Sequence, residues 1–577
     1  MGKGEMRIGF PFSRRRARTS GVAADDGQAR GTNSILENLA TAEDVVAKWG
    51  TNSSTEVKQS SSLFSAEGRA DVPAFLRAVG DLQITMLFYS SANCDLPEDS
   101  CCSSLVRAQT LMQSAIHRLE QEFQLILCSN KDGFEMKPLA GGGAADDLQS
   151  IAEIMIANGY GRDCVRAYEI HRKTIVDDGL RRLCFDLPSQ SQIKKLKWEL
   201  LEHKICSWIA GARTAVGTLF TRERLLCDHV FAGFDSAAES CFSGATLDAA
   251  LRLVAFPEAI AKAKLSPEKL FRILDLFEAV AVLSPELESV FSPASTSAVV
   301  AKAGESLRAL AKSARCMLAG FEAAVQKFAS DSPVIGGAVH PLARYAMNYL
   351  CFLADYTPTL ADIFANDPFR PPKPLPEESL PSHSQVAAAP EVAERLAWVL
   401  LILLCKLDLT AGAYSDISLS YLFLANNLRY VVNKVRRSGL IMVLGEEWAE
   451  RQEAKATRYA EKYVKLGWGS AAAAVPVPEE ESPVPAALEE FNRTLEEACR
   501  RQKGWVVADD GMRKEVRAVV EAMILPAYQG AYRRCLAACG GQPPAAAAAP
   551  EDLRAQLAKV FSGSDFGSSP GSSVAPI

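Results

Sequence analysis

Cysteine and histidine are the side chains that most often bind metals or act as nucleophiles and bases, and this chain has 15 cysteines and 6 histidines. Cys227-Asp228-His229 brings the two types closest together. A zinc site usually needs four ligands with tight pair spacing, and no second pair is evident. We therefore predict no metal site and interpret these side chains as structural. The histidines are isolated from one another along the chain: His117, His171, His203, His229, His340 and His383.

Motifs for other kinds of chemistry are also weak. Gly159-Tyr160-Gly161 resembles half of a nucleotide-binding fingerprint, but it follows a predicted helix instead of a strand, and the sequence has no P-loop. The acidic pairs Asp177-Asp178 and Glu446-Glu447 are consecutive on predicted helices, so their side chains diverge instead of facing one substrate. No serine elbow or positioned Cys/His dyad is evident. We predict that the protein is not an enzyme and binds no cofactor.

The elements that position these residues are clearest in the stretch 148–231. Apolar residues recur at helical spacing up to Asn158-Gly159, a pair that ends many helices in the left-handed conformation. A second helix follows from about Asp163 and ends before Pro188, and a third begins near Gln192. Such antiparallel helices have two apolar faces and must stack on neighbours, which favours a rod or solenoid over an enzyme with a pocket.

The composition excludes several classes of protein. With 48% hydrophobic residues and a net charge of -6, the chain can bury a long core and is unsuited to bulk nucleic-acid binding. In the segment 445–468, glutamates interleave with basic and aromatic residues, which predicts a solvated helix and no nucleic-acid contact. The apolar run 396–405 is too short to span a bilayer and is predicted to be a buried helix. Scattered cysteines without a secretory signal favour a cytoplasmic location.

Periodicity predicts an all-α chain in four parts. Residues 1–31 are predicted to be a disordered basic tail, and the alternatives for its arginines are contact with anionic lipid or an import signal. An N-terminal helical region covers 32–140, and a longer helical rod covers 148–563. Residues 564–577 are predicted to be a disordered C-terminal tail.

Two proline-rich segments, 367–390 and 469–487, are predicted to be flexible loops that interrupt the second helical region. Repeated prolines remove backbone donors and clash with the preceding turn, so these segments are not expected to form packed helices. The first loop contains a polyproline-type stretch at 371–376. Two interpretations of it stay open, an ordinary flexible excursion and a ligand for an SH3-like groove.

Separated blocks of the sequence carry a resemblance to a known family. They are RAQTLMQSAIHRLEQEFQLIL, LEHKICSWIAGARTAVGTLFTRERLLCDHVF, SDISLSYLFLANNLRYVVNKVRRSGLIMVLGEEWAERQ, FNRTLEEACRRQKGWVVADDGMRKEVRAVVEAMILPAYQGAYRR and PEDLRAQLAKVFSG. In this order, and together with the stretch 148–231, they resemble the plant branch of the Exo-seventy subunit family of the exocyst tethering complex. The resemblance covers nearly everything from about Asn33 to Gly563.

The resemblance implies an elongated rod of stacked antiparallel helical bundles, without catalytic activity, that tethers secretory vesicles to the plasma membrane as a peripheral protein. Its implied partners are other exocyst subunits, small GTPases and membranes that contain phosphatidylinositol bisphosphate. Each cation near such a surface contributes on the order of 1 kcal/mol. In the family, basic residues toward the C-terminal end bind phosphoinositides, and the corresponding residues here are Arg513, Lys514, Arg517, Arg533 and Arg534.

Two departures from the family pattern leave a second function open. The segment 540–549, GGQPPAAAAA, is uncharged where the family usually has basic and aromatic residues, so phosphoinositide affinity is expected to be weakened. The match also begins after the position of the family's long front helix, which is expected to weaken incorporation into the exocyst. The alternative is therefore an adaptor that works outside the assembled exocyst, in plant immunity or trafficking, with immune-related proteins as partners.

Overall fold

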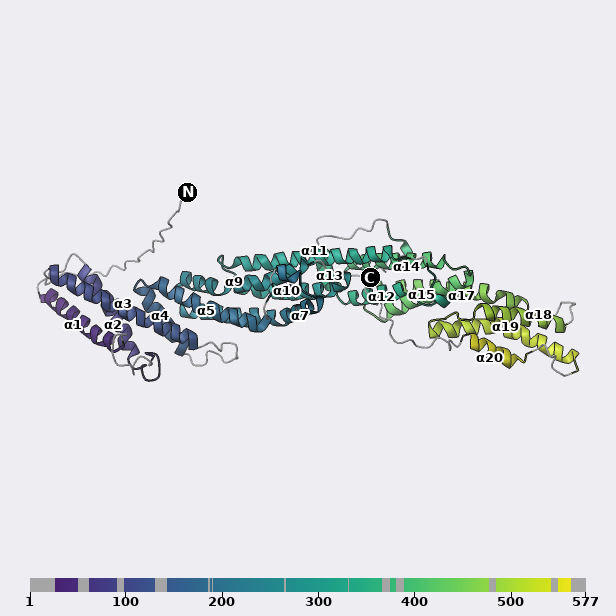
Figure 1. The fold of residues 1–577 in the computed structure, drawn as a ribbon, viewed down its shortest axis with the longest axis horizontal. Coiled ribbons are helices and arrows are strands. Elements are labelled where there is room, and N and C mark those ends of the chain that lie inside the picture. The colour runs from purple at the N-terminus through teal and green to yellow at the C-terminus, as the bar shows by residue number, and fades with distance from the viewer. Residues whose placement is uncertain are drawn as a thin grey trace. The chain divides into compact units, whose positions relative to one another are not determined.

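The structure of the chain is a computed structural model in which helices and short connections follow one another (Figure 1). The residues that it describes are 26–49, 62–90, 98–129, 143–184, 187–188, 190–263, 266–329, 332–365, 374–379, 389–476, 484–540 and 548–561. Within these ranges there is no β-strand, so the predicted all-α class is confirmed. Within the same ranges, no helix is both long enough and apolar enough to cross a membrane.

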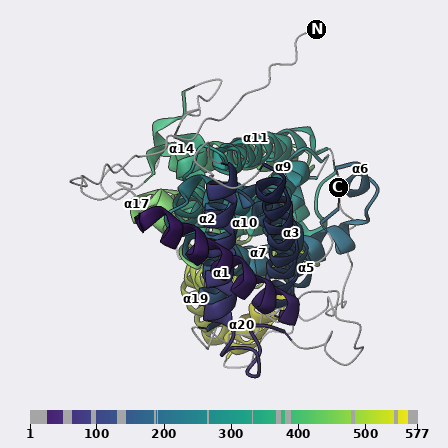
Figure 2. The same ribbon diagram turned by 90° about the vertical axis from the view of Figure 1, so that its left-hand side faces the viewer.

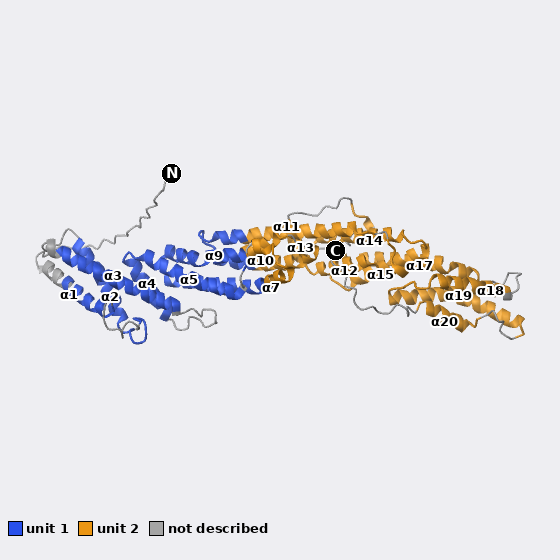
Figure 3. Ribbon diagram, in the orientation of Figure 1, with its two compact units in different colours: residues 1–187, 206–254, 283–302 blue, residues 188–205, 255–282, 303–577 orange. Residues whose placement is uncertain are grey.

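The chain divides into two compact units, which Figure 3 colours separately. Unit 1 comprises Met1–Leu187, Cys206–Val254 and Leu283–Lys302, and unit 2 comprises Pro188–Ile205, Ala255–Val282 and Ala303–Ile577. The division falls within several helices, which contribute residues to both units: α7 (Trp198–Thr214), α9 (Asp235–Ala261), α10 (Leu270–Val290) and α11 (Ser297–Lys327).

Unit 1 packs helices that are neighbours in the sequence against one another, and Figure 2 turns these first helices toward the viewer, with α1 in front. Its other elements are α1 (Asp26–Trp49), α2 (Val72–Ser90), α3 (Glu98–Ser129), α4 (Gly143–Ala157), α5 (Gly161–Cys184), the π-helix η1 (Ala215–Phe220) and α8 (Thr221–Val230). As predicted, α4 ends at Asn158-Gly159. Gly159 has φ +88°, and the Tyr160 amide donates to the Met155 carbonyl at 2.8 Å. This left-handed turn reverses the chain into α5.

The third helix predicted for 148–231 is interrupted, which corrects the expectation of one continuous element. A short helix α6 (Gln190–Ile193) precedes α7, and η1 then separates α7 from α8. In η1 the Thr221 hydroxyl donates to the Val216 carbonyl five residues earlier, at 2.9 Å. A π turn holds one residue more than an α turn, and here it buries Val216 and Phe220 together. Apolar spacing alone does not signal this change of pitch.

A buried polar group holds α5 and α8 together in unit 1. Glu223 on α8 accepts a hydrogen bond from the Tyr168 hydroxyl at 2.8 Å and forms an ion pair with Arg172 at 2.6 Å. The Cys227 thiol donates to the Tyr168 oxygen at 3.3 Å. Burial lowers the pKa of Arg172, but the charge of Glu223, its hydrogen bond and the nearby Tyr168 together outweigh burial, and the net direction is upward. The group is therefore a satisfied structural cluster.

Unit 2 contains the remaining helices. They are η2 (Pro267–Lys269), η3 (Ile335–Gly337), α12 (Pro341–Ala354), α13 (Thr357–Phe364), η4 (Glu377–Ser379), α14 (Pro390–Ala411), α15 (Ile417–Arg436), α16 (Leu440–Leu444), α17 (Glu446–Ala473), α18 (Val484–Arg501), α19 (Asp510–Ala538) and α20 (Pro550–Val560). The predicted buried helix at 396–405 lies in α14, where Leu396, Leu400 and Leu403 are buried. That prediction is confirmed.

Helices α15 and α17 form the antiparallel pair on which the polar network below depends. Arg436 pairs with Glu446, and seven residues earlier on α15, Arg429 pairs with Glu453 seven residues later on α17. The expectation of a solvated helix for 445–468 is wrong on one side, because Trp448 is 1% exposed. The glutamates point outward or to α15, while the aromatic face fills the core. Charge interleaving reports only the exposed face of a helix.

The C-terminal helices α17 to α20 share one hydrophobic core. Figure 1 shows α18, α19 and α20 side by side, and the contacts between successive helices agree. Trp468 on α17, Phe491 on α18, Tyr528 on α19 and Leu557 on α20 are buried together. The Tyr528 hydroxyl also donates to the Ala548 carbonyl at 2.8 Å, which ties α19 to the segment before α20.

The predicted boundaries of the tails and loops differ from the structure. Helix α1 begins at Asp26, inside the expected tail 1–31, and the preceding residues lie outside the described ranges. The expected loop 469–487 overlaps two helices, because α17 continues to Ala473 and α18 begins at Val484. Residues 469–473 contain no proline, and Pro485 occupies the first turn of α18, where its missing N–H is not needed.

The other expected loop, 367–390, is described only in part. Pro390 is the first residue of α14, and Glu377–Ser379 form the short helix η4, which contacts α14 and α17. Within the polyproline-type stretch, Leu375 is buried. Residues 366–373 and 380–388 lie outside the described ranges, as does the expected C-terminal tail 564–577.

Candidate functional site: the polar hub of helix α15 and the cations of helix α19

Two consecutive asparagines, Asn426 and Asn427, lie in the middle of α15 and are almost completely buried. Asparagine competes with the helix backbone for hydrogen bonds, so it is unfavourable in a helix interior unless other groups satisfy its amide. Here the partners come from two connecting segments of unit 2. These segments are 334–340, before α12, and 505–509, before α19.

Asn426 binds both segments at once. Its Nδ2 donates to the carbonyl oxygens of Gly337 and Val506, at 2.7 Å each, and its Oδ1 accepts from the Ala508 amide at 2.8 Å. The two segments also pair directly, because the Val506 amide donates to the Gly336 carbonyl at 2.8 Å. One side chain therefore satisfies three backbone groups that no helix could satisfy.

Asn427, on the neighbouring face of the helix, binds the first segment, 334–340. Its Oδ1 accepts from the His340 amide at 2.8 Å, and its Nδ2 donates to the Phe423 carbonyl at 2.8 Å. His340 is the N-cap of α12, where its Nδ1 accepts from the Leu342 amide at 3.0 Å. Burial lowers the pKa of His340, which keeps the ring neutral and able to accept that hydrogen bond.

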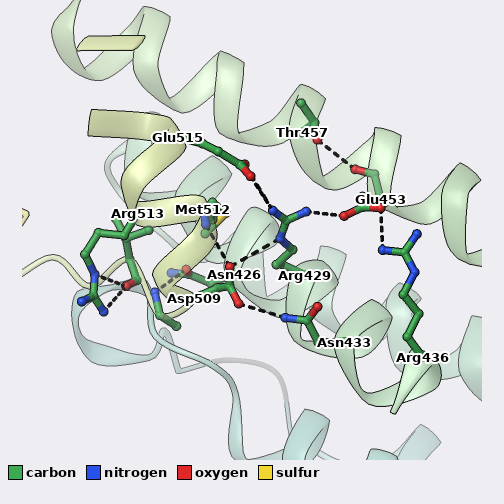
Figure 4. Close-up of polar contacts among 12 residues, drawn as sticks. Asn426, Arg429, Asn433, Arg436, Glu453, Thr457, Asp509, Met512, Arg513 and Glu515 are labelled. Atoms are coloured by element: carbon green, nitrogen blue, oxygen red, sulfur yellow. Dashed lines mark hydrogen bonds and ion pairs between the residues drawn. The ribbon is translucent and has the colours of Figure 1, made fainter. Parts of the chain in front are cut away.

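Arg429, one turn after Asn426, binds carboxylates from two other elements (Figure 4). Its guanidinium lies 2.5 Å from Glu453 on α17, 3.0 Å from Glu515 on α19 and 3.5 Å from Asp509. Asn433 donates to Asp509 at 2.9 Å. The side chain of Arg429 is only 12% exposed, so the pairs are better shielded from water than ordinary surface ion pairs.

Asp509 is the N-cap of α19 and connects this helix to the hub. Its Oδ1 accepts from the Met512 amide at 2.9 Å. Burial raises the pKa of Asp509, but the Met512 amide, the charge of Arg429 and the Asn433 amide together outweigh burial and lower it. The carboxylate therefore stays ionised and holds the start of α19 against α15.

Three of the predicted phosphoinositide-binding cations follow in the first turns of α19. The Arg513 guanidinium donates to the Val507 carbonyl at 3.0 and 3.1 Å and pairs with Asp510, and Arg517 pairs with Glu521 at 2.7 Å. Lys514 is exposed. Within the described residues it has no hydrogen-bond or carboxylate partner. Arg513 and Arg517 therefore already have partners within the protein, whereas Lys514 has none among the described residues.

The other two predicted cations, Arg533 and Arg534, lie near the C-terminal end of α19. Arg534 donates to the Pro476 carbonyl at 2.9 Å, while Arg533 is exposed. At a rise of about 1.5 Å per residue, Lys514 and Arg533 are separated by roughly 28 Å along the helix. That distance exceeds the Debye length of about 8 Å at physiological salt. The structure places the five cations on one helix but does not bring them together as one patch.

Cys227 and His229 have separate partners. Cys227 is buried against Tyr168, while the exposed His229 lies 2.9 Å from Asp146. Burial raises the pKa of Cys227, so its thiol is a poor nucleophile or metal ligand. Within the described residues, no group of three or more His, Cys, Asp or Glu side chains is placed to hold a metal ion. The two side chains of the acidic pair Asp177-Asp178 bind different partners, Arg252 and Arg181 respectively.

The hub residues Asn426, Asn427 and Arg429 were not predicted as a site. A signal for them exists in the sequence, because two asparagines and an arginine interrupt the apolar stripe of SYLFLANNLRYVV, where they must find partners when buried. The partners of Asn426, and Glu515 among the partners of Arg429, lie 80 to 89 residues away along the chain. What the arrangement does chemically is to position backbone segments and three helices of unit 2.

Comparisons with known proteins agree on one family. Residues 206–559 match the family model for the C-terminal part of the Exo70 exocyst complex subunit, and residues 38–129 match the model for the N-terminal part of the exocyst complex component Exo70. The exocyst complex component EXO70B1 of Arabidopsis thaliana is 28% identical over 513 residues, covering 80% of this chain and 79% of the relative. EXO70A1 of the same plant is 29% identical over 552 residues, covering 85% and 84%.

The fold is also similar to a solved structure of this family. The crystal structure of the Saccharomyces cerevisiae exocyst component Exo70p has a TM-score of 0.60 to this chain at 13% sequence identity, and the match covers 91% of this chain and 100% of that one. At this identity the likeness concerns the fold alone. The matched C-terminal domain includes the whole α15 hub and α19. Because the family models match most of its length, the chain belongs to the Exo70 family of exocyst complex subunits, here of the plant type.

Proposed function

We propose that this protein is a non-enzymatic subunit of the exocyst that tethers secretory vesicles to the plasma membrane. The observation that carries this proposal is the match to both Exo70 domain models in their natural order, from residue 38 to residue 559. Two features of the described residues fit it. The buried group of Tyr168, Arg172 and Glu223 is satisfied within the fold, and Cys227 and His229 have separate structural partners.

The proposed partners are other exocyst subunits, with small GTPases and phosphatidylinositol bisphosphate membranes as further contacts at the plasma membrane or on secretory vesicles. For the membrane, the proposed cations are the five of α19: Arg513, Lys514, Arg517, Arg533 and Arg534. Lys514 and Arg533 are the two that the fold leaves available, and their separation makes two weak contacts instead of one strong one. Contact with lipid is therefore expected to depend strongly on salt.

The test is co-purification of the tagged full chain from native plant cells, followed by detection of other exocyst subunits by mass spectrometry. Sedimentation with phosphatidylcholine vesicles that contain phosphatidylinositol bisphosphate tests the lipid contact separately. Substitution of Lys514 and Arg533 by Gln should reduce sedimentation, whereas the matched pair Arg308→Gln and Lys312→Gln on α11 should not. Absence of exocyst subunits from the purified material would remove the tethering function.

A second candidate is an adaptor that works outside the assembled exocyst, with immune-related proteins as partners. It is favoured by the uncharged segment 540–549 and by the carbonyl and carboxylate partners that already occupy Arg513, Arg517 and Arg534. This candidate predicts capture of specific partners without co-fractionation of exocyst subunits. Size-exclusion chromatography of a native extract distinguishes the two, because an assembled complex elutes far ahead of a 62.3 kDa chain.

A further inference from the structure

A groove of about 670 Å³ lies beside the α15 hub, between α12 and α15 of unit 2. Each helix presents a stripe of lining residues at helical spacing: Arg344, Asn348, Cys351 and Phe352 from α12, and Asn426, Tyr430, Asn433, Lys434 and Arg437 from α15 and its C-terminal cap. The volume falls in the range of small-molecule sites, about 300 to 1,000 Å³. None of the cations in this groove belongs to α19.

Cations from both helices flank the ring of Tyr430 in this groove. The Arg344 guanidinium and the Lys434 ammonium each lie 5.8 Å from the ring centroid. Lys434 also donates to the Asn348 Oδ1 at 2.8 Å, which leaves the NH₂ of that amide as a donor. Arg344 and Arg437 are both exposed, and within the described residues neither has a carboxylate partner. The groove thus offers forked donors with unused hydrogen-bonding capacity.

The negative charge in the wall is already neutralised. Asp509 is the acidic residue among the lining side chains, and its oxygens accept from Asn433 and the Met512 amide and face Arg429. The remaining polar lining consists of amides, the Tyr430 hydroxyl, the Cys351 thiol and Ser438, whose hydroxyl donates to the Lys434 carbonyl at 2.8 Å. A site rich in donors and poor in acceptors suits a ligand that brings only acceptor oxygens.

We propose that this groove binds a phosphate group, with Arg344, Lys434 and Arg437 as the binding residues and Asn348 as an additional donor. Arginine forks match phosphate oxygens in bidentate geometry, and lysine contributes a point charge. The phosphate can belong to a free small molecule or to a lipid headgroup. This inference is independent of the tethering function, because it uses none of the α19 cations and no exocyst partner.

The test is isothermal titration calorimetry of the full chain with inorganic pyrophosphate. We expect saturable binding that the double variant Arg344→Gln, Arg437→Gln weakens by on the order of tenfold or more, since each lost contact is a hydrogen bond to a charged group. The double variant Arg308→Gln, Lys312→Gln on α11 removes the same charge elsewhere in unit 2 and should bind as the wild type. Arg344→Lys with Arg437→Lys should restore part of the affinity.

The source of the phosphate is distinguished by vesicles of phosphatidylcholine with and without phosphatidic acid. Sedimentation that requires phosphatidic acid, and that pyrophosphate reverses, assigns the groove to a lipid; binding of pyrophosphate alone assigns it to a free ligand. Unchanged circular dichroism and thermal unfolding of the variants exclude misfolding. Equal affinity of the wild type and the Gln variant for pyrophosphate would overturn the proposal, and so would binding of poly-glutamate in place of pyrophosphate.

Discussion

The side chain of Asn426 is joined to Gly337 by a hydrogen bond of 2.7 Å, from the Asn426 Nδ2 to the Gly337 carbonyl oxygen. Gly337 has φ +66°, and a Cβ at this residue would lie 2.8 Å from the Leu419 side chain. A left-handed glycine therefore aims its carbonyl at a buried amide that also binds the segment before α19. The stability of unit 2 is expected to depend on these contacts more than on any surface charge.

Substitution of Asn426 by Ala should destabilise unit 2 by about 3 kcal/mol, because the carbonyls of Gly337 and Val506 and the Ala508 amide each lose a buried partner. The exposed Asn348, replaced by Ala, serves as the control and should change the free energy of unfolding much less. Urea unfolding followed by circular dichroism measures both. Equal stability of the two variants would contradict the central role of Asn426.

Substitution of Gly336 by Ala should also be destabilising. Gly336 has φ +67°, and an added Cβ would collide with the Gly504 carbonyl oxygen. The cost is expected to be about 1 to 3 kcal/mol from the left-handed backbone alone. Gly469 on α17 is the matched control, because its Cβ position is open. There alanine should stabilise the helix, by up to about 1 kcal/mol. Opposite shifts of the melting temperature are the expected result.

Loss of Arg429 should weaken the contact of the start of α19 with α15 and α17. Arg429→Met leaves Glu453, Glu515 and Asp509 without their shared cation, and we expect a loss of about 2 to 3 kcal/mol, reduced from a fully buried pair because Glu515 is exposed. Arg493→Met breaks only the exposed pair with Glu490 and should have little effect. Hydrogen exchange resolves the location, with faster exchange at the start of α19 expected in the first variant alone.

The stability of unit 2 should fall as the pH falls through the ordinary pKa of histidine. Burial lowers the pKa of His340 below its usual 6.5, so the unfolded chain binds a proton that the folded chain does not. The free energy of unfolding is therefore highest above about pH 6.5 and falls progressively as the pH drops below that value. His340→Asn keeps an N-cap acceptor that does not titrate, so the melting temperature should depend less on pH between about 7.5 and 5.5.

Removal of Glu223 should affect unit 1 and leave unit 2 unchanged. Glu223→Ala leaves the buried Arg172 without its carboxylate and the Tyr168 hydroxyl without its acceptor. We expect a loss of about 3 to 5 kcal/mol. Hydrogen exchange should accelerate in α5 and α8 and not in α15. Uniform acceleration across the chain would show that the two units unfold together.

The sequence determined the helices, because their signals are local. The apolar stripe of 396–405 predicted a buried helix, and Asn158-Gly159 predicted the turn that ends α4, where the structure has φ +88°. The blocks that resemble the Exo-seventy family led to the family that the comparisons show. Residue type predicted the ends of helices less reliably, because Gly469 to Ala473 extend α17 into an expected loop and Asp26 begins α1 inside an expected tail.

Only the tertiary structure decided which polar side chains act together. Spacing along one helix indicates the pairs Arg513–Asp510 and Arg517–Glu521, but it could not show that Arg534 donates to the Pro476 carbonyl, 58 residues away. Nor could it predict that Asn426 reaches Gly337 and Val506, because those partners lie about 80 residues away and depend on how α12, α15 and α19 pack. Helix formation is a local property of the chain, whereas the grouping of charges depends on contacts between distant segments.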